Sequence, residues 1–229
     1  MADIHNDLQI FVVTNERSTF PYVLKGIEQQ TVDNLGVIVI KNMKWVDALN
    51  NIVDRCTTKY FIRCDDDFFL HPCAVQFIFD GMIEQENAIM GCYKLWEDWS
   101  DRVSGGVKIY NTSRVRKLGG FEENHRGSVD GKFSKKIKKS KYNETGNKMS
   151  VLGIHARATL EEMMQYEKIW NEKVGKVFTK WKPDKKTTKQ MKKYTKTVEE
   201  QFDMCIPLLR KINKSRHSDF FKAIKRWEK

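Results

Sequence analysis

The first third of the chain alternates short apolar runs with segments of helical periodicity. Apolar, largely β-branched runs at 8–14, 36–40 and 59–64 are each followed by polar residues, which is typical of buried parallel strands. Helices are predicted between them, over 21–30 and 46–55, from the spacing of apolar residues. The order β-α-β-α-β predicts a parallel sheet covered by helices, with ligands binding at the carboxyl ends of its strands.

The pattern continues less regularly toward the C-terminus. We expect a helix over 72–86, strands over 88–93 and 105–110, and a loop rich in Trp, Asp and Ser over 96–104. Three further helices are predicted, at 159–174 from a capping box and an apolar stripe, at 191–205 as a helix ended by Pro207, and at 220–227. The second half of the chain therefore reads as mainly helical.

Charge divides the chain into an acidic front and a basic back. The 229 residues carry a net charge of +11, and residues 176–229 alone hold 17 Lys and Arg against 6 Asp and Glu. Residues 1–131 carry a net charge of −5, and lysines recur over 132–148. Such a separation predicts one part that holds cations and another that meets a polyanion.

Neither the cysteines nor the hydropathy suggest a secreted or membrane protein. The number of cysteines is odd and no Cys-x-x-Cys spacing occurs, so we expect reduced core residues at positions 56, 64, 73, 92 and 205. No apolar run reaches the ~18–20 residues of a membrane span, and the first ten residues lack the basic and apolar regions of a signal peptide. The expected location is the cytoplasm.

Three consecutive carboxylates stand where the third predicted strand ends. Asp65, Asp66 and Asp67 would repel one another and raise each other's pKa values unless a divalent cation or a helix N-terminus neutralises them. The alternative is a surface turn that caps the next helix. Because the three residues follow a buried strand of an α/β unit, we favour a metal or nucleotide-phosphate site.

An ordered set of motifs resembles the inverting glycosyltransferases of the glycosyltransferase-A fold, in particular family two. The set spans roughly residues 8–157 and consists of VVTNE at 12–16, IEQQT at 27–31, VIVIKN at 37–42, YFIRCDDDFFLHP at 60–72, GGFEE at 119–123, Asp130 and GIHA at 153–156. The resemblance implies an α/β catalytic domain with a Rossmann-like nucleotide-binding sheet over 1–157. Residues 158–229, which the resemblance does not cover, are expected to form a basic helical extension that could bind the acceptor.

The resemblance also implies a metal site. The Asp-x-Asp motif of the family holds Mn²⁺ or Mg²⁺ on the diphosphate of a nucleotide sugar, so Asp65 and Asp67 would be metal ligands, with Asp65 and Asp66 also close to the nucleotide. His155 matches a late histidine that many members place on the same metal. Imidazole would favour manganese, since magnesium prefers oxygen ligands.

The loops after the first two strands would bind the nucleoside. Thr14, Asn15 and Glu16 match the loop that cradles the base, and Asn42 follows the second strand, where Lys41 and Asn42 replace the acidic residue that the family often has. An ordinary strand-ending loop explains the first three equally well. Uridine is the default base by resemblance.

Asp130 is the predicted general base, which takes the proton of the acceptor hydroxyl during inverting transfer. Val129 stands where the family often has the Glu of a Glu-Asp pair, so Glu122 or Glu123 could serve instead, and Asp130 could also cap a helix. Tyr93, Trp96 and Trp99 could stack on a sugar or base, or belong to the core.

The basic segments suggest an acidic acceptor. Our leading hypothesis is a hydroxyl on a modified base in DNA, because lysines and arginines bind phosphates regardless of sequence. The alternatives are a glycan or lipid-linked glycan acceptor at the inner membrane face, with the basic helices on the bilayer. Two further readings stay open: a metal-dependent phosphohydrolase or nuclease, and a non-catalytic protein that binds nucleic acid.

Overall fold

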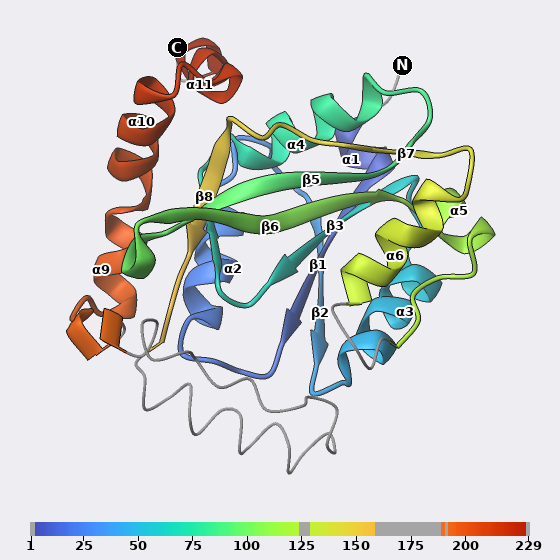
Figure 1. Cartoon of the computed structure of the whole chain (residues 1–229), viewed down its shortest axis with the longest axis horizontal. Helices are drawn as coiled ribbons and strands as arrows, with labels where there is room; N and C mark the ends of the chain where they lie inside the picture. The colour runs from blue at the N-terminus through green and yellow to red at the C-terminus, as the bar shows by residue number, and fades with distance from the viewer. Residues whose placement is uncertain (1–2, 124–128, 159–188, 191, 228–229) are drawn as a thin grey trace.

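A mixed β-sheet with helices on both faces forms the body of the protein. The computed structural model describes residues 3–123, 129–158, 189–190 and 192–227 (Figure 1). The helix predicted at 159–174 lies outside these ranges. None of the described helices is long and apolar enough to cross a lipid bilayer.

Eight strands make up the sheet in the order β2-β1-β3-β6-β5-β8-β4, with β7 pairing with β5. Their bounds are β1 Leu8–Thr14, β2 Gly36–Lys41, β3 Tyr60–Asp65, β4 Phe68–Leu70, β5 Ala88–Glu97, β6 Arg102–Asn111, β7 Asn143–Thr145 and β8 Val151–His155. Strands β2, β1 and β3 are parallel, which confirms the prediction for the first third of the chain. Beyond them β6 is antiparallel to β3 and to β5.

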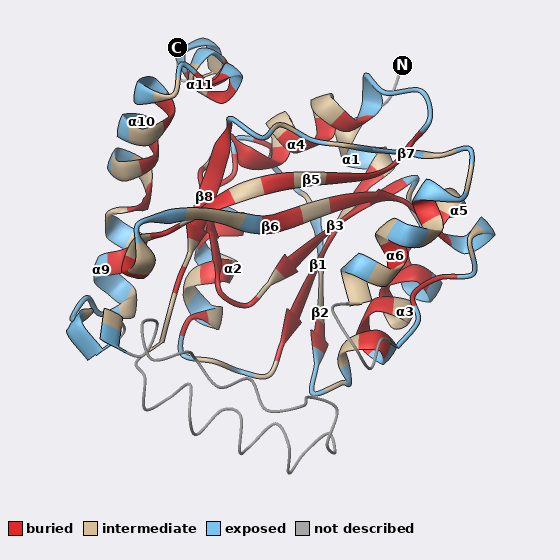
Figure 2. Ribbon diagram, viewed as in Figure 1, coloured by how far each residue is buried: buried red, intermediate tan, exposed pale blue. Residues whose placement is uncertain are grey.

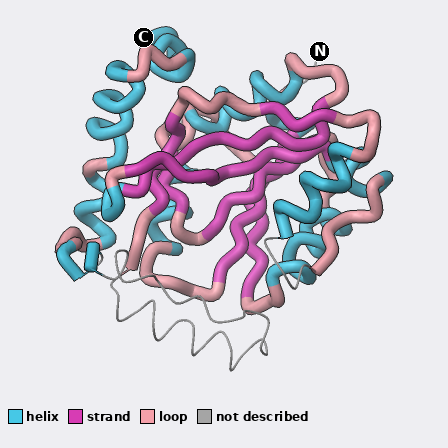
Figure 3. Tube along the Cα trace, viewed as in Figure 1, coloured by secondary structure: helices cyan, strands magenta, loops and turns pink. Residues whose placement is uncertain are grey.

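The helices divide between the two faces of the sheet (Figure 3). They are α1 Ile4–Asp7, α2 Phe20–Glu28, α3 Trp45–Arg55, α4 Ala74–Ile83, α5 Thr112–Lys117, α6 Val129–Lys138, α9 Val198–Asp203, α10 Cys205–Ser215 and α11 Asp219–Trp227. Helices α2, α4, α10 and α11 contribute to one apolar cluster. Helices α3, α5 and α6 contribute to another.

The central strands are buried on both sides, because alternate side chains enter different clusters. Strand β1 is buried along most of its length (Figure 2). Its residues Ile10 and Val12 belong to the first cluster, while Phe11 and Val13 belong to the second. This double burial explains the continuous apolar run in the sequence. The strand predicted to be buried at 36–40 differs, since β2 lies at the edge of the sheet and Val37 is 38% exposed.

The loop predicted at 96–104 is wrong. Strand β5 continues to Glu97 and β6 begins at Arg102, so the two form a hairpin whose turn contains the short 3-10 helix Asp98–Ser100. The polar composition conceals the strand, but Leu95 is buried because it packs over Gly106. A Cβ atom at Gly106 would lie only 2.3 Å from Leu95 Cγ, so this glycine serves packing.

The single helix predicted at 191–205 is also wrong in its extent. Thr197 starts α9 with a capping box, and α10 follows at Cys205. Pro207 does not end a helix but lies in the first turn of α10, where its missing N–H costs no intrahelical hydrogen bond. The last predicted helix, at 220–227, is confirmed by α11.

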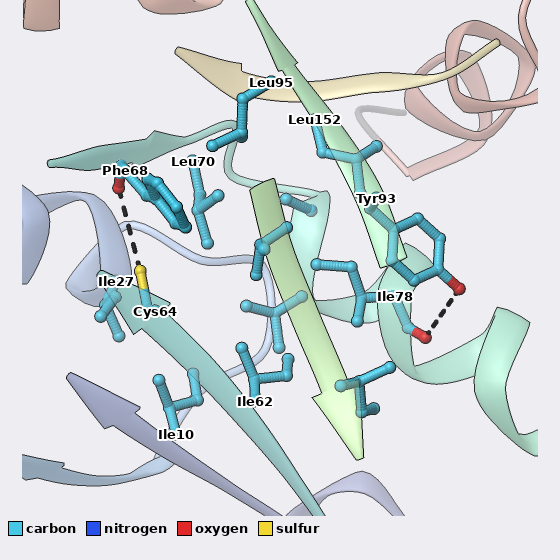
Figure 4. Packing of buried hydrophobic residues seen from close by; sticks show 14 of the residues in the cluster. Ile10, Ile27, Ile62, Cys64, Phe68, Leu70, Ile78, Tyr93, Leu95 and Leu152 are labelled. Atoms are coloured by element: carbon cyan, nitrogen blue, oxygen red, sulfur yellow. Dashed lines mark hydrogen bonds between the residues drawn. The ribbon is translucent and has the colours of Figure 1, made fainter. Parts of the chain in front are cut away.

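The C-terminal helices join the core of the sheet domain. Cys205 and Leu209 from α10, and Phe220 and Ile224 from α11, are buried in the same cluster as Ile10 of β1. Figure 4 shows the centre of that cluster, where side chains from several strands meet those of α2 and α4. All five cysteines are free, as expected, and all but Cys92 are buried. Helices α9 to α11 are therefore part of the folded body, whichever role the basic extension has.

Leu209→Ala should show how strongly α10 stabilises this body. Leu209 is fully buried, so its truncation is expected to lower the free energy of unfolding by about 2–5 kcal/mol, measured by urea denaturation. Lys211→Ala, an exposed change on the same helix, should have a much smaller effect. Equal effects of the two variants would contradict the packing role of α10.

Candidate active site

The three consecutive carboxylates reach three different sets of partners. Asp65 is the last residue of β3, while Asp66 and Asp67 form the turn to β4. The carboxylate of Asp65 lies 3.2 Å from the Nε of Arg63, that of Asp66 meets the loop after β1, and that of Asp67 meets the end of β8. Cations and hydrogen-bond donors, each from a different element, thus relieve the repulsion that the sequence predicts.

Asp66 connects the loop after β1 to the turn after β3 by hydrogen bonds. Its Oδ2 accepts hydrogen bonds from the Thr14 hydroxyl at 2.8 Å and the Asn15 backbone N–H at 3.1 Å, and its carbonyl accepts one from the Thr19 hydroxyl. Burial raises the pKa of Asp66 to about 6, although Arg17 opposes the change. The carboxylate is thus engaged within the protein, and its predicted contact with a nucleotide stays a prediction.

Thr14, Asn15, Glu16 and Asn42, the predicted nucleoside residues, come together where β1 and β2 end. The Asn42 N–H donates to the Thr14 carbonyl at 3.1 Å, and Lys41 Nζ lies 3.1 Å from Glu16 Oε1. Glu16 and Asn42 both have positive φ angles, of 66° and 52°, which turn the chain sharply after each strand. The two loops therefore form one continuous rim at the carboxyl ends of the parallel strands.

Asp67 lies among three basic side chains. Its Oδ2 is 2.5 Å from Arg17 Nη1, 3.3 Å from His155 Nε2 and 4.0 Å from Arg157 Nη1. Burial alone would raise its pKa, but the charges of His155 and Arg17 hold the pKa of Asp67 well below its usual range. Asp67 is therefore a carboxylate at neutral pH, and it brings two motifs that the sequence separates widely into contact.

His155 ends β8 and touches a second carboxylate on its other side. Its Nδ1 lies 3.2 Å from Oε1 of Glu97, the last residue of β5. Burial opposes protonation of the ring, but Asp67 outweighs it, so the pKa of His155 is raised. Burial also opposes ionisation of Glu97, yet hydrogen bonds from His155 and Arg102 lower the pKa of Glu97 to about 2.

Two of the three predicted metal ligands converge, and the third does not. Asp67 and His155 present an oxygen and a nitrogen to the same point, a donor pair that suits manganese better than magnesium. Asp65 instead faces Arg63. In the described part of the chain no group of three or more His, Cys, Asp and Glu side chains is arranged to hold a metal ion. The roles of Asp67 and His155 as metal ligands therefore stay predictions.

Asp130, the predicted base, lies in the first turn of α6 and shares a cation with the triple carboxylate. Arg63, buried in β3, is 3.0 Å from Asp130 Oδ1, and Lys108 of β6 is 2.7 Å from Asp130 Oδ2. Arg63 and Lys108 are directly opposed across the two strands, a like-charge pair that needs an anion between them. Burial would raise the pKa of Asp130, but these two cations lower it to about 2.

The ion pairs of Asp130 with Arg63 and Lys108 affect whether it can act as the general base. A carboxylate with so low a pKa takes up protons weakly, so Asp130 would act as a base only with Arg63 or Lys108 drawn away from it. Of the alternatives, Glu122 forms ion pairs with Lys132 and Lys136 at the surface. The assignment of Asp130 as base remains a prediction.

Sequence analysis missed several residues of the site: Arg17, Arg63, Glu97 and Arg157. The position of Arg157, two residues after the histidine of GIHA, was a usable signal. The role of Glu97 depends on the hairpin that was predicted to be a loop. Trp99, in the turn of that hairpin, is buried, and the guanidinium carbons of Arg157 and Arg102 lie 5.3 and 5.5 Å from the centre of its ring. Tyr93 is a core residue whose hydroxyl donates to the Ile78 carbonyl.

Two buried amides from the C-terminal helices hold β8, the strand that carries His155. The side chain of Gln201 accepts from the Arg157 N–H and donates to the Arg157 carbonyl, both at 2.8 Å. Asn213 likewise accepts from the Val151 N–H at 3.0 Å and donates to the Val151 carbonyl at 2.7 Å. Both amides are almost fully buried. The histidine end of the site is therefore positioned in part by the basic extension.

Comparison with solved structures identifies the fold. The chain is similar to the mannosyltransferase PcManGT from Pyrobaculum calidifontis in complex with GDP-Man and Mn²⁺, with a TM-score of 0.53 and 12% identity over 69% of this chain and 59% of that one. It is also similar to TarS 1-349 from S. aureus in complex with UDP-GlcNAc, with a TM-score of 0.54 and 12% identity over 69% and 60% of the two chains. The chain thus spans about three fifths of these proteins.

A third similar structure is glucosyl-3-phosphoglycerate synthase from Mycobacterium tuberculosis with Mn²⁺, UDP and phosphoglyceric acid, with a TM-score of 0.51 and 12% identity over 69% of this chain and 74% of that one. No protein family model and no curated protein sequence matches the chain. These likenesses show the fold, which is the glycosyltransferase-A fold expected from the motifs.

Asp130→Asn tests the ion cluster independently of activity. Because the pKa of Asp130 falls from 3.8 to about 2 on folding, its ionised form stabilises the protein by about 2 kcal/mol at pH 7. This contribution is complete above about pH 4 and is lost as the pH falls toward 2. The free energy of unfolding should therefore differ between wild type and variant at pH 7 and converge near pH 2.

Urea denaturation at pH 7, 4 and 2.5 provides the measurement. Asp33→Asn, at an exposed position, serves as the matched control and should change stability little at each pH. A difference for Asp130→Asn that stays constant from pH 7 to pH 2.5 would contradict the assignment of the cluster.

Proposed function

We propose that the protein is a metal-dependent glycosyltransferase that moves a sugar from a nucleotide sugar, by default a UDP-sugar, to an acceptor hydroxyl with inversion. The observation that carries the proposal is the meeting of Asp67 and His155, 3.3 Å apart, from two motifs far apart in the chain. They lie beside the Thr14–Glu16 loop, since Asp66 bonds that loop directly. The nucleotide sugars bound to structural neighbours support the same reading.

Each side chain has a defined task in this proposal. Asp67 and His155 would hold Mn²⁺ or, less favourably, Mg²⁺, and the cation would stabilise the charge that develops on the departing nucleoside diphosphate. Thr14, Asn15, Glu16 and Asn42 would contact the nucleoside. Asp65, held by Arg63, would face the nucleotide side of the site, without coordinating the metal in the arrangement seen here.

Asp130 would take the proton of the acceptor hydroxyl. It is connected to Asp65 through Arg63, so the base and the triple carboxylate belong to one cluster. Movement of Lys108 toward substrate phosphate would free Asp130 Oδ2 and raise its basicity, because Lys108 is one of the two cations that keep its pKa low.

For the acceptor we retain a hydroxylated base in DNA as the leading proposal. Helix α6 carries Asp130 in its first turn, Lys135 and Lys138 lie exposed along the same helix, and the exposed Lys139 follows it directly. A polyanion bound along α6 would bring its hydroxyl groups toward Asp130. A free glycan acceptor predicts no such dependence on these lysines, whereas a lipid-linked acceptor predicts that basic side chains bind an anionic bilayer instead of DNA.

Thermal unfolding with nucleoside diphosphates and nucleotide sugars, with and without Mn²⁺, tests the donor site. A donor at 100 times its Kd stabilises the folded state by about 2.7 kcal/mol, which raises Tm by about 5–10 °C in a protein of this size. We expect a manganese-dependent rise selective for one nucleotide. Asp67→Ala should remove it, whereas Asp130→Asn should keep it and abolish sugar transfer in a turnover assay.

Two results would count against the proposal. Donor binding unchanged in Asp67→Ala would exclude Asp67 as a metal ligand, and the absence of any shift with all nucleotides would remove the glycosyltransferase assignment. Release of inorganic phosphate or cleavage of nucleic acid without a nucleotide sugar would favour a phosphohydrolase or nuclease instead.

A further inference from the structure

Glu97 is a buried carboxylate that is not among the predicted site residues. It is 3% exposed, at the end of β5, and its two oxygens have different neighbours. Oε2 accepts from Arg102 Nε at 2.6 Å and from the Ser100 hydroxyl at 3.0 Å. Oε1 lies 3.2 Å from His155 Nδ1, and Arg157 is next at 4.0 Å.

The competing acceptor on the other side of the imidazole is less available. Asp67 Oδ2 lies 3.3 Å from His155 Nε2, but it already receives a hydrogen bond of 2.5 Å from Arg17. Glu97 Oε1 has no comparably close donor other than His155 within the described residues. A neutral imidazole carries one ring proton, which goes to the nitrogen that faces the better acceptor.

We infer that Glu97 is a positioning residue that holds the ring proton of His155 on Nδ1 and so presents the lone pair of Nε2 toward Asp67. A carboxylate behind a histidine fixes both the tautomer and the orientation of the ring, which sets the ability of the far nitrogen to bind a metal. The consequence for metal binding rests on the proposed function. The tautomer itself does not.

The chain provides an isosteric variant with a definite expected outcome. In Glu97→Gln, Arg102 and Ser100 both donate to the position of Oε2, so the amide oxygen is drawn there and the amide NH₂ faces His155. Nδ1 must then accept a hydrogen bond, and the ring proton moves to Nε2. Glu97→Leu removes the acceptor altogether and is expected to shift the proton in the same direction.

Nitrogen-15 NMR of the histidine side chains in the metal-free full chain tests this directly. Spectra are taken at a pH where the His155 ring is neutral, and its signals are assigned by their loss in His155→Gln. Wild type should show an unprotonated Nε2, and both Glu97 variants a protonated Nε2. Arg102→Gln, which removes the donor on the other oxygen of Glu97, is the control and should keep the wild-type tautomer.

A wild-type tautomer in the Glu97 variants, or the same shift in Arg102→Gln, would overturn the inference. Manganese affinity in the presence of UDP separates it from the proposed function, with a loss of about 10–100-fold expected in Glu97→Gln. If wild type binds no manganese while the tautomer still depends on Glu97, the positioning role stands and the proposed metal chemistry fails. Unchanged manganese affinity in Glu97→Gln would show that the tautomer has no role in metal binding.

Discussion

The neutralisation of three adjacent carboxylates at the end of a buried strand is the constraint on which the site depends. Asp66 and Asp67 are almost completely buried, and Asp65 is partly buried. Buried carboxylates are tolerated only when they are paired or hydrogen-bonded. Each therefore requires a partner: Asp65 finds one within β3, Asp66 in the loop after β1, and Asp67 in that loop and at the end of β8.

That requirement determines how the loops are arranged. Asp66 accepts hydrogen bonds from Thr14 and Asn15 in the loop after β1, and Asp67 contacts His155 at the end of β8. Arg63 bridges Asp65 and Asp130, which brings the start of α6 toward the triple carboxylate. These contacts place the loop after β1, the end of β8 and the start of α6 around the three carboxylates.

The sequence predicted the parts of this arrangement that depend on local pattern. The double burial of β1 and β3 follows from uninterrupted apolar runs, and the meeting of Asp67 with His155 follows from the order of the family motifs. The hairpin of β5 and β6 was missed because its strand ends are rich in polar residues, and its apolar contact, Leu95 over Gly106, is visible only in three dimensions. Glu97 was missed for the same reason, since its partner arrives from β8.

The tail illustrates another limit of prediction. Its basic composition indicated a charged extension, and within the described residues 192–227 most lysines and arginines are exposed. The residues that matter to the site are the few that are neither charged nor exposed, such as Gln201 and Asn213. Amide side chains are uncharged, so they do not enter a charge count. Whether such an amide is buried or solvated depends on which backbone groups of the folded chain still need a hydrogen-bond partner.

The two-way hydrogen bonds of Gln201 and Asn213 to β8 also constrain the order in which the protein can be assembled. Their partners, Arg157 and Val151, precede them by 44 and 62 residues. Gln201 and Asn213 are synthesised after β8, so these bonds cannot form until α9 and α10 have been made. During synthesis the parallel unit of β1, β2 and β3 can form while β8 still lacks these bonds. The segment around His155 thus gains these bonds only after α9 and α10 have left the ribosome, so the parallel unit of the sheet can form before the candidate site is complete.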